Sequence, residues 1–162
     1  MTAAPTERTR VKRLNKRAKY DEETVHGILD ASPACHVGYT FKGSPFVTPT
    51  LQWREGDHIY WHGSSASRML EACEEADVCV NVTIIDGFVM ARSAFNHSCN
   101  YRSVMAFGKA FKVTDRDEKL ALRGGPDVHP ARSSVLFLNR AKGGLLAVTS
   151  QPPNPRNPAM AP

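Results

Sequence analysis

The sequence predicts a mainly β fold of the α+β class: an antiparallel barrel of six strands with two or three short helices. About six short segments are rich in β-branched and aromatic residues and are separated by turn signals. Only two or three segments have the apolar spacing of an amphipathic helix, too few for an alternating parallel α/β sheet. A chain of 162 residues suits one domain.

The first helix is expected to begin after Asp21, whose carboxylate can cap it. Two glutamates follow in its first turn, where the helix dipole favours them, and Pro33 ends the segment. Residues 35–39 then predict a strand and residues 42–44 a turn.

The second strand, residues 46–53, contains Pro49. Proline has no amide to donate to a sheet, so Pro49 marks an edge, a bulge or a place where the backbone faces a ligand. A third strand at residues 58–62 leads into a helix expected to end near Ala76.

Residues 78–85 are strongly β-branched and predict a central strand. Asp86 and Gly87 form a hairpin signal, with a returning strand at residues 88–93 and a polar elbow at residues 96–99. The later elements expected are a strand at residues 101–113 with a bend at Gly108, a helix from Asp115 to Leu122, and strands at residues 135–138 and 145–148.

The net charge of +5 is concentrated near the start of the chain. The first 20 residues hold seven of the 21 basic residues, all between Arg8 and Lys19, and a single acid, Glu7, so the rest of the chain is nearly neutral. We expect a basic arm at residues 1–19, one folded domain at residues 20–150 and a Pro-rich disordered tail at residues 151–162. No nucleic-acid module follows the arm, so a nucleic-acid partner is not expected.

The four cysteines have neither C-x-x-C pairing nor zinc spacing, and no signal peptide precedes them. Reduced thiols in a cytoplasmic protein and no metal site are therefore expected. No apolar run has membrane-spanning length, so no membrane partner is expected either.

The junction at residues 62–70 has the composition of an anion site. A strand passes through Gly63 into a helix whose first turn offers free amides, serine hydroxyls and Arg68, which together can hold a phosphate. The alternative is a plain strand-to-helix connection capped by Ser64 or Ser65.

Arg92 and Arg102 lie in strand-like sequence, each followed by a serine. An arginine in a half-buried strand is costly unless an anion meets it, which makes both candidates for the same anion. The alternative is that they face solvent or pair with carboxylates.

Three segments, residues 86–95, 96–98 and 100–104, resemble the signature of the pyridoxamine 5′-phosphate oxidase-like superfamily. More narrowly, they are similar to its flavin-nucleotide-binding and nitroimidazole-resistance branch. Further matches in the same order extend the resemblance over about residues 8–122.

The resemblance implies a six-stranded FMN-binding split barrel, usually a homodimer with a flavin at each end of the interface. Ser67 and Arg68 would meet the FMN phosphate, the strand around Pro49 would lie along the isoalloxazine, and His62 would be a catalytic proton donor. His62 could instead only brace the turn. The cofactor-binding residues implied are Thr48, Pro49, Thr50, His62, Gly63, Ser64, Ser67, Arg68, Arg92, Asn100, Arg102 and Ser103.

By the same resemblance the protein is expected to be an FMN-dependent oxidoreductase that reduces a small organic substrate, with a nitroaromatic as one candidate. One alternative is a flavin-binding or carrier module without turnover. Another is a haem-handling split barrel, a branch that uses a C-terminal histidine region, whereas the last histidine here is His129.

The sequence departs from the family after residue 122. Residues 128–132 only weakly echo a family segment, and the residues after 132 do not match. We therefore expect part of the last barrel strands to be missing.

Overall fold

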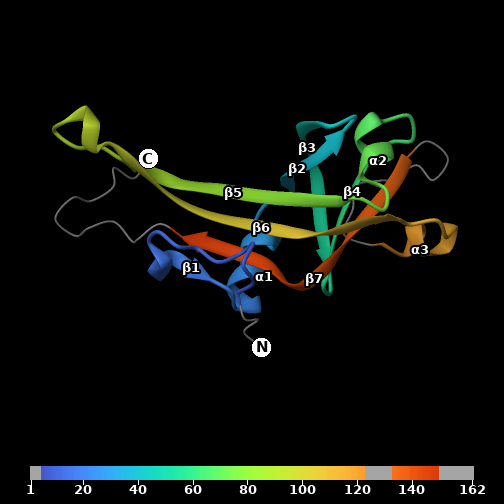
Figure 1. The fold of residues 1–162 in the computed structure, drawn as a ribbon, viewed down its shortest axis with the longest axis horizontal. Coiled ribbons are helices and arrows are strands. Elements are labelled where there is room, and N and C mark those ends of the chain that lie inside the picture. The colour runs from blue at the N-terminus through green and yellow to red at the C-terminus, as the bar shows by residue number, and fades with distance from the viewer. Residues whose placement is uncertain (1–4, 123–132, 150–162) are drawn as a thin grey trace.

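The computed structural model describes residues 5–122 and 133–149 (Figure 1). Six antiparallel strands form a closed ring in the order β7, β4, β3, β2, β5, β6, and the pairing of β6 with β7 closes it. The antiparallel six-stranded barrel is therefore confirmed. Its strands are β2 (Ala34–Phe41), β3 (Ser44–Glu55), β4 (His58–Ser64), β5 (Asp77–Val89), β6 (Ser98–Lys112) and β7 (Ser133–Thr149).

Three short helices accompany the barrel, as expected. In α1 (Glu22–Asp30) the Asp21 carboxylate accepts a hydrogen bond from the Thr24 amide at 2.9 Å. In α3 (Arg116–Ala121) Asp115 caps in the same way. The remaining elements are α2 (Arg68–Cys73), the 3-10 turns η1 (Asn15–Arg17) and η2 (Ala94–Asn96), and the short strand β1 (Ala18–Lys19).

The barrel interior is packed with apolar side chains. Alternate residues of each strand point inward, as a strand period of two requires, and α1 adds its own buried face. The largest fully buried side chains include Trp61, Leu29, Leu136 and Leu138. All four cysteines are free, and burial raises the pKa of Cys35 and of Cys73 to about 12.

A second cluster lies outside the barrel. It consists of Trp53, Tyr60, Val113 and Val135, with the Trp53 and Tyr60 rings stacked at a centroid distance of 5.6 Å. The strands β3 and β4 thus bury both faces at this point, which explains the aromatic residues at neighbouring positions.

The N-terminal segment lies against the barrel from residue 5 onward. The Tyr20 hydroxyl donates to the Thr9 carbonyl at 3.0 Å and accepts from the Val11 amide at 3.1 Å. Ala18 pairs with Val148 of β7. The described part of the basic arm is therefore folded onto the domain.

The hairpin predicted at Asp86 and Gly87 is wrong. β5 continues through both residues to Val89, with a register shift between Ile85 and Gly87, and pairs with β6 up to Ser98. The chain reverses between β5 and β6 instead, through η2. A side-chain bond between the His97 Nδ1 atom and the Ala91 amide, at 3.1 Å, stabilises that connection.

The expected loss of the last barrel strands is also wrong. The two strands predicted at residues 135–138 and 145–148 belong to one strand, β7, which pairs with β4 and with β6. The register of β6 against β7 shifts between Ala106 and Gly108, as the predicted bend requires. The Pro-rich tail and residues 128–132 lie outside the described residues.

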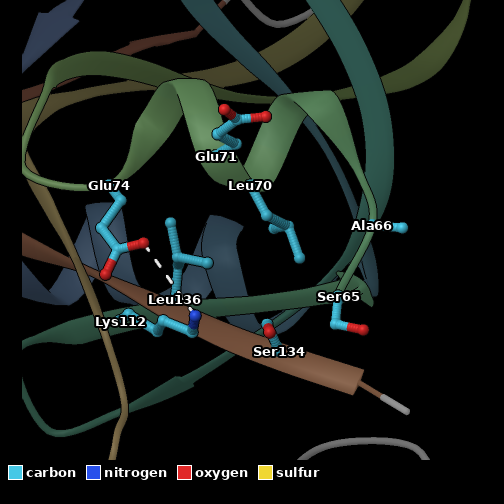
Figure 2. A pocket seen from close by; sticks show the side chains of 8 residues that line it. All are labelled: Ser65, Ala66, Leu70, Glu71, Glu74, Lys112, Ser134 and Leu136. Atoms are coloured by element: carbon cyan, nitrogen blue, oxygen red, sulfur yellow. Dashed lines mark ion pairs between the residues drawn. The ribbon is translucent and has the colours of Figure 1, made fainter.

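Helix α2 is shorter than predicted, ending at Cys73 rather than near Ala76, and its N-cap is Ser67 rather than Ser64 or Ser65. Its apolar side is buried as expected. Leu70 points toward Leu136 of β7, so α2 covers one end of the barrel (Figure 2).

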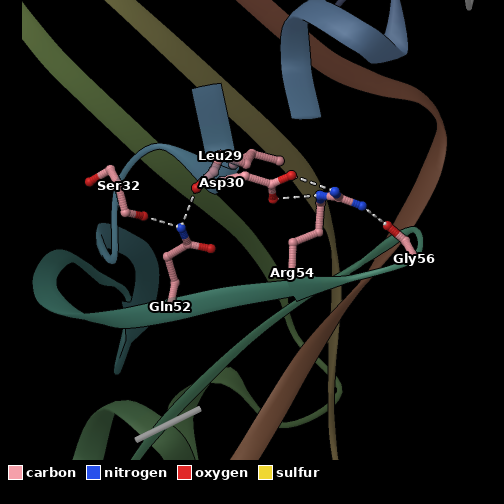
Figure 3. Close-up of polar contacts among 6 residues, drawn as sticks. All are labelled: Leu29, Asp30, Ser32, Gln52, Arg54 and Gly56. Carbon is pink, nitrogen blue, oxygen red and sulfur yellow. Dashed lines mark hydrogen bonds and ion pairs between the residues drawn. The ribbon is translucent and has the colours of Figure 1, made fainter. Parts of the chain in front are cut away.

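Gln52 joins α1 to the barrel (Figure 3). Its Nε2 atom donates to the backbone carbonyls of Leu29, at 2.8 Å, and of Ser32. Beside it, Arg54 donates to both carboxylate oxygens of Asp30, at 2.9 and 2.6 Å. The two Gln52 bonds add a side-chain donor to carbonyls at and just after the end of α1, and the Arg54–Asp30 pair ties the same end of the helix to β3.

Replacing Gln52 with leucine should lower the free energy of unfolding by about 1–3 kcal/mol, because it removes two hydrogen bonds, to the carbonyls of Leu29 and Ser32. Urea unfolding at neutral pH measures the change, with Lys119→Ala, a change to a partly exposed residue of α3, as control. Unfolding midpoints that coincide for the two variants would contradict this role of Gln52.

Candidate functional site

The first half of β3 has an open edge. β2 pairs with residues Ser44 to Leu51 of β3, whereas β4 pairs only with Gln52 to Glu55. Among the described residues no strand pairs with the other side of residues 44–51. The prediction that Pro49 marks an edge is therefore confirmed.

The prolines decide which backbone groups face that edge. Pro45 and Pro49 have no amide hydrogen, and in an antiparallel ladder every second residue bonds to the same neighbour. The Gln52 amide donates to the Pro33 carbonyl on the β2 side, at 2.7 Å, so the even-numbered residues bond toward β2. The amides of Val47 and Leu51 consequently point to the open edge, and those of Thr48 and Thr50 do not.

The side chains of Thr48 and Thr50 point to the barrel side of β3. The Thr48 hydroxyl lies 3.2 Å from the Tyr39 hydroxyl. The Thr50 hydroxyl donates to the His62 carbonyl at 3.1 Å, which ties the open half of β3 to the end of β4. The predicted flavin strand and the predicted phosphate junction are thus in contact.

The junction between β4 and α2 is compact. Gly63 lies against Leu70, and a Cβ atom at residue 63 would meet the Leu70 side chain at 3.4 Å, which favours glycine there. The Ser67 amide donates to the Ser64 carbonyl at 2.8 Å, and the Ser67 side chain makes no capping bond. The hydroxyl groups of Ser64, at the end of β4, and of Ser67, at the start of α2, both lie at this junction.

Arg68 lies on two aromatic rings. Its guanidinium carbon is 4.7 Å from the centre of the Phe46 ring and 5.5 Å from that of Phe41. These contacts hold an exposed cation in a fixed position next to the open half of β3. No described carboxylate pairs with Arg68.

The backbone and the side chain of His62 have different surroundings. Its carbonyl accepts from Thr50, whereas its imidazole lies on the outer face, 6.2 Å between ring centres from Trp53. Partial burial lowers the pKa of His62 below its usual value of 6.5, which favours the neutral imidazole. This position is beside the aromatic cluster rather than among the side chains of Thr48 and Thr50.

The remaining predicted residues lie far along β5 and β6. Arg102 is engaged by Asp86 in three hydrogen bonds of 2.8 to 3.1 Å, which raises the pKa of Arg102 and lowers that of Asp86. Ser103 donates to the Val82 carbonyl and lies 2.8 Å from the Thr83 hydroxyl.

Arg92 lies in the connection after β5 and is exposed, so the strand expected around it is wrong. Asn100 lies on β6 and pairs with Gly87 of β5.

The structure therefore divides the predicted cofactor residues into two groups. The first group lies around the open half of β3 and the β4–α2 junction: Thr48, Pro49, Thr50, His62, Gly63, Ser64, Ser67 and Arg68. The second group lies on or next to the distal part of β5 and β6: Arg92, Asn100, Arg102 and Ser103.

Several important neighbours were missed from sequence. The amides of Val47 and Leu51 are available at the open edge, Phe41 and Phe46 carry Arg68, and Asp86 neutralises Arg102. The proline spacing at positions 45 and 49 was a usable signal for the amides. The other contacts depend on strand register, which sequence spacing alone does not give.

A recess of about 200 Å³ opens beside the junction, between α2 and β7 (Figure 2). Ser65 and Ser134 line it together with Glu71, Glu74 and Lys112; Lys112 lies 4.0 Å from Glu74. None of the predicted cofactor residues lines it. No group of metal-binding side chains occurs in the described residues, and none of their helices is long and apolar enough to span a membrane.

Comparison with known proteins assigns the chain to a family. A family profile described as Pyridoxamine 5′-phosphate oxidase matches residues 21–152. The chain belongs to this family. A search of curated proteins gave no match.

Solved structures of relatives agree with this family assignment. The flavocytochrome Anf3 from Azotobacter vinelandii is 42% identical, with a TM-score of 0.79 over 93% of this chain and 77% of its own. An FAD and haem binding protein from Mycobacterium smegmatis is 28% identical, with a TM-score of 0.72 over 84% and 74%.

A more distant relative shows the fold alone. This protein from Bacteroides thetaiotaomicron, assigned to 5-nitroimidazole antibiotic resistance, is 20% identical, with a TM-score of 0.61 over 80% of this chain and 84% of its own. The split-barrel fold implied by the sequence is therefore confirmed.

The lowered pKa of His62 predicts a stability that falls in acid. Well above pH 6.5 the imidazole is neutral in the folded and the unfolded chain, so its contribution is complete there. Below pH 6.5 the unfolded chain takes up the proton first, so the free energy of unfolding decreases as the pH falls.

The variant His62→Gln should therefore show a smaller loss of melting temperature than the parent protein between about pH 7.5 and about pH 5.5. Thermal unfolding followed by circular dichroism measures both losses. His26, whose pKa is lowered mainly by burial, is present in both proteins and cancels. Equal losses would show that the His62 ring is not buried as described.

Proposed function

We propose that this family member is a flavin-binding redox protein that passes electrons, with FAD as its flavin. The observation that carries the proposal is the open half of β3 beside Arg68. At this edge the amides of Val47 and Leu51 face away from β2, and no described strand pairs with them. Arg68, next to the edge, has no carboxylate partner among the described residues.

The open edge suits a flat heteroaromatic ring better than another strand. Pro45 and Pro49 interrupt the donors that a neighbouring strand would need, so further strand pairing is disfavoured. Val47 and Leu51 would donate their amides to polar atoms at the rim of the flavin ring. A bound flavin would supply the hydride and electron chemistry, and the protein would supply orientation.

The phosphate end would meet the β4–α2 junction. Arg68 is already positioned by Phe41 and Phe46, so little side-chain entropy is lost when it binds an anion. The hydroxyls of Ser64 and Ser67 lie on the same junction and can donate to phosphate oxygens.

FAD is favoured over the FMN expected from sequence because of the relatives. The Mycobacterium smegmatis protein, 28% identical, is described as binding FAD and haem, and the Azotobacter vinelandii protein, 42% identical, as a flavocytochrome. Both descriptions also favour an electron carrier over reduction of a nitroaromatic. Stopped-flow reduction of the flavin-loaded protein by NAD(P)H, with and without a nitroaromatic, separates these two functions.

The proposed assembly is a homodimer. The outer face of β3, β2, β5 and β6 presents exposed apolar side chains, among them Val47, Leu51 and Met105. Such a face on a single sheet is suited to packing against a second copy.

Arg68→Ala should raise the dissociation constant for FAD about 10- to 100-fold, because a charged hydrogen bond to phosphate contributes about 1.5–3 kcal/mol. Titration of the flavin-free protein, followed by flavin fluorescence, measures the constant. Lys119→Ala removes a cation from α3 and serves as the charge-matched control. If both variants bind FAD like the parent protein, the phosphate has been placed wrongly.

Haem is the second cofactor that we propose, and histidines on β4 are its candidate ligands. His58 and His62 flank Tyr60 on the outer face of the strand, beside Trp53 and Phe137. The His62 imidazole, whose lowered pKa favours the neutral form, lies next to an aromatic ring, which suits an axial haem ligand. These residues would hold the iron and cover the porphyrin.

Addition of haemin to the purified protein should produce a Soret band that His62→Ala or His58→Ala weakens or shifts. His36→Ala, an exposed histidine on β2, is the matched control. A band identical in all three variants would remove both β4 histidines as ligands, and no band in the parent protein would remove the haem proposal.

A further inference from the structure

A short loop before α1 carries most of the positive charge at the start of the chain. Residues 12–19, which we call the basic loop, contain η1 and β1. They hold five cations and no acid: Lys12, Arg13, Lys16, Arg17 and Lys19. None of these side chains belongs to the flavin or haem sites proposed above, so their concentration in one loop needs a different explanation.

Contacts with the folded domain fix both ends of the basic loop. The Tyr20 hydroxyl, just after the loop, donates to the Thr9 carbonyl and accepts from the Val11 amide, just before it. Ala18 pairs with Val148 of β7. The cations are therefore held on a folded surface rather than on a free chain, and less chain entropy is lost when they meet a partner.

The cations of the basic loop have no anionic partner of their own. Among the described residues no carboxylate forms an ion pair with any of the five, whereas Arg54 and Arg102 are each held by an aspartate. Four of the five are exposed, and Arg17 is half-buried. β1 and α2 lie well apart in the molecule (Figure 1), so an anion at the β4–α2 junction of the same chain does not account for these cations.

An exposed leucine lies in the middle of these charges. The exposed fraction of Leu14 is 56%, and its backbone is left-handed, with φ 56° and ψ 42°. A leucine is strained in this region because its Cβ atom crowds the backbone. The Leu14 carbonyl accepts from the Arg17 amide at 2.9 Å, which closes η1. The fold thus presents an apolar side chain to solvent between Arg13 and Lys16.

An apolar side chain surrounded by cations suits the surface of an anionic bilayer. That surface offers a continuous layer of phosphates with acyl chains beneath it, so it can meet the cations and Leu14 together. A nucleic-acid backbone offers phosphates but no apolar layer. An acidic protein surface would have to present carboxylates alone, whereas protein surfaces usually mix both signs of charge. A peripheral contact inserts no helix, so it does not require an apolar run of membrane-spanning length.

We propose that the basic loop docks this protein on the surface of anionic phospholipid membranes. Its five cations lie among the headgroup phosphates, and Leu14 enters the boundary between the headgroups and the acyl chains. β1 and Tyr20 hold the loop in the conformation that presents both kinds of side chain. The docking requires no bound flavin, so it stands or fails independently of the proposed function.

Vesicle sedimentation tests the docking on the full chain. The protein should sediment with phosphatidylcholine vesicles that contain about 30% phosphatidylglycerol, and stay in the supernatant with pure phosphatidylcholine vesicles. Raising the ionic strength from about 0.05 M to about 0.5 M should release it, because the Debye length becomes shorter. No sedimentation with the anionic vesicles at the lower ionic strength, or equal sedimentation with both kinds of vesicle, would overturn the proposal.

A pair of charge variants tests whether the basic loop makes the contact. Lys16→Gln combined with Arg17→Gln should lower the partition coefficient about 25-fold, at about fivefold for each cation near the surface. Lys109→Gln combined with Lys119→Gln removes the same charge from β6 and α3 and is the matched control. Equal losses in the two double variants would mean that net charge rather than the basic loop attracts the protein, and the proposal fails.

Leu14→Asn tests the apolar part of the contact. Asparagine tolerates a left-handed backbone, so the melting temperature should not fall. The partition coefficient should fall about tenfold, because the buried leucine side chain is lost. A variant that binds the anionic vesicles like the parent protein shows that Leu14 does not enter the bilayer, which overturns the proposal.

A DNA duplex of about 20 base pairs is the competing ligand in the same assay. With vesicles and duplex at equal phosphate concentration, the proposal expects the protein to remain with the vesicles. Release of the protein from the vesicles by the duplex would assign the basic loop to nucleic acid and overturn the membrane contact.

Discussion

The pairing of β7 with β4 on one side and β6 on the other is the constraint on which the structure depends. An open sheet of this size would leave two long edges with unpaired amides and carbonyls. β7 removes both edges and encloses the apolar faces of the strands in one core. Because β1 also pairs with β7, the segment just before α1 is fixed to the same strand.

Closure of the ring leaves one gap at β3. β4 pairs with only the last part of β3, so the first half of β3 exposes backbone groups although it belongs to a closed barrel. The prolines at positions 45 and 49 keep that half free of a further strand, and the two phenylalanines below it position Arg68. A rigid scaffold with a small unpaired backbone segment is a common basis for ligand binding, because the groups are oriented before the ligand arrives.

The arrangement also explains why half of the family signature lies far from the site. Residues 86–104 span the distal ends of β5 and β6 and the connection between them. There Asp86 pairs with Arg102, and the side chains of Phe88 and Phe95 are exposed. In one chain these residues touch neither Arg68 nor the open edge. The signature is therefore divided between two ends of the sheet, and strand pairing rather than sequence distance sets which of its residues lie near the open edge.

Sequence alone determined the local elements and the family. Asp21 and Asp115 marked their helices, β-branched runs marked the strands, and Pro49 marked an edge, because capping, propensity and a missing amide act over a few residues. It did not determine where β5 turns, how far α2 runs or that β7 completes the barrel. Those features depend on pairing between residues distant in the chain: the extended partner strand β6 carries β5 past Asp86 and Gly87, and β4 and β6 together hold β7. Only the tertiary structure decided that Arg68 and Arg92 lie apart, because strand direction and register, rather than sequence spacing, set the position of each side chain.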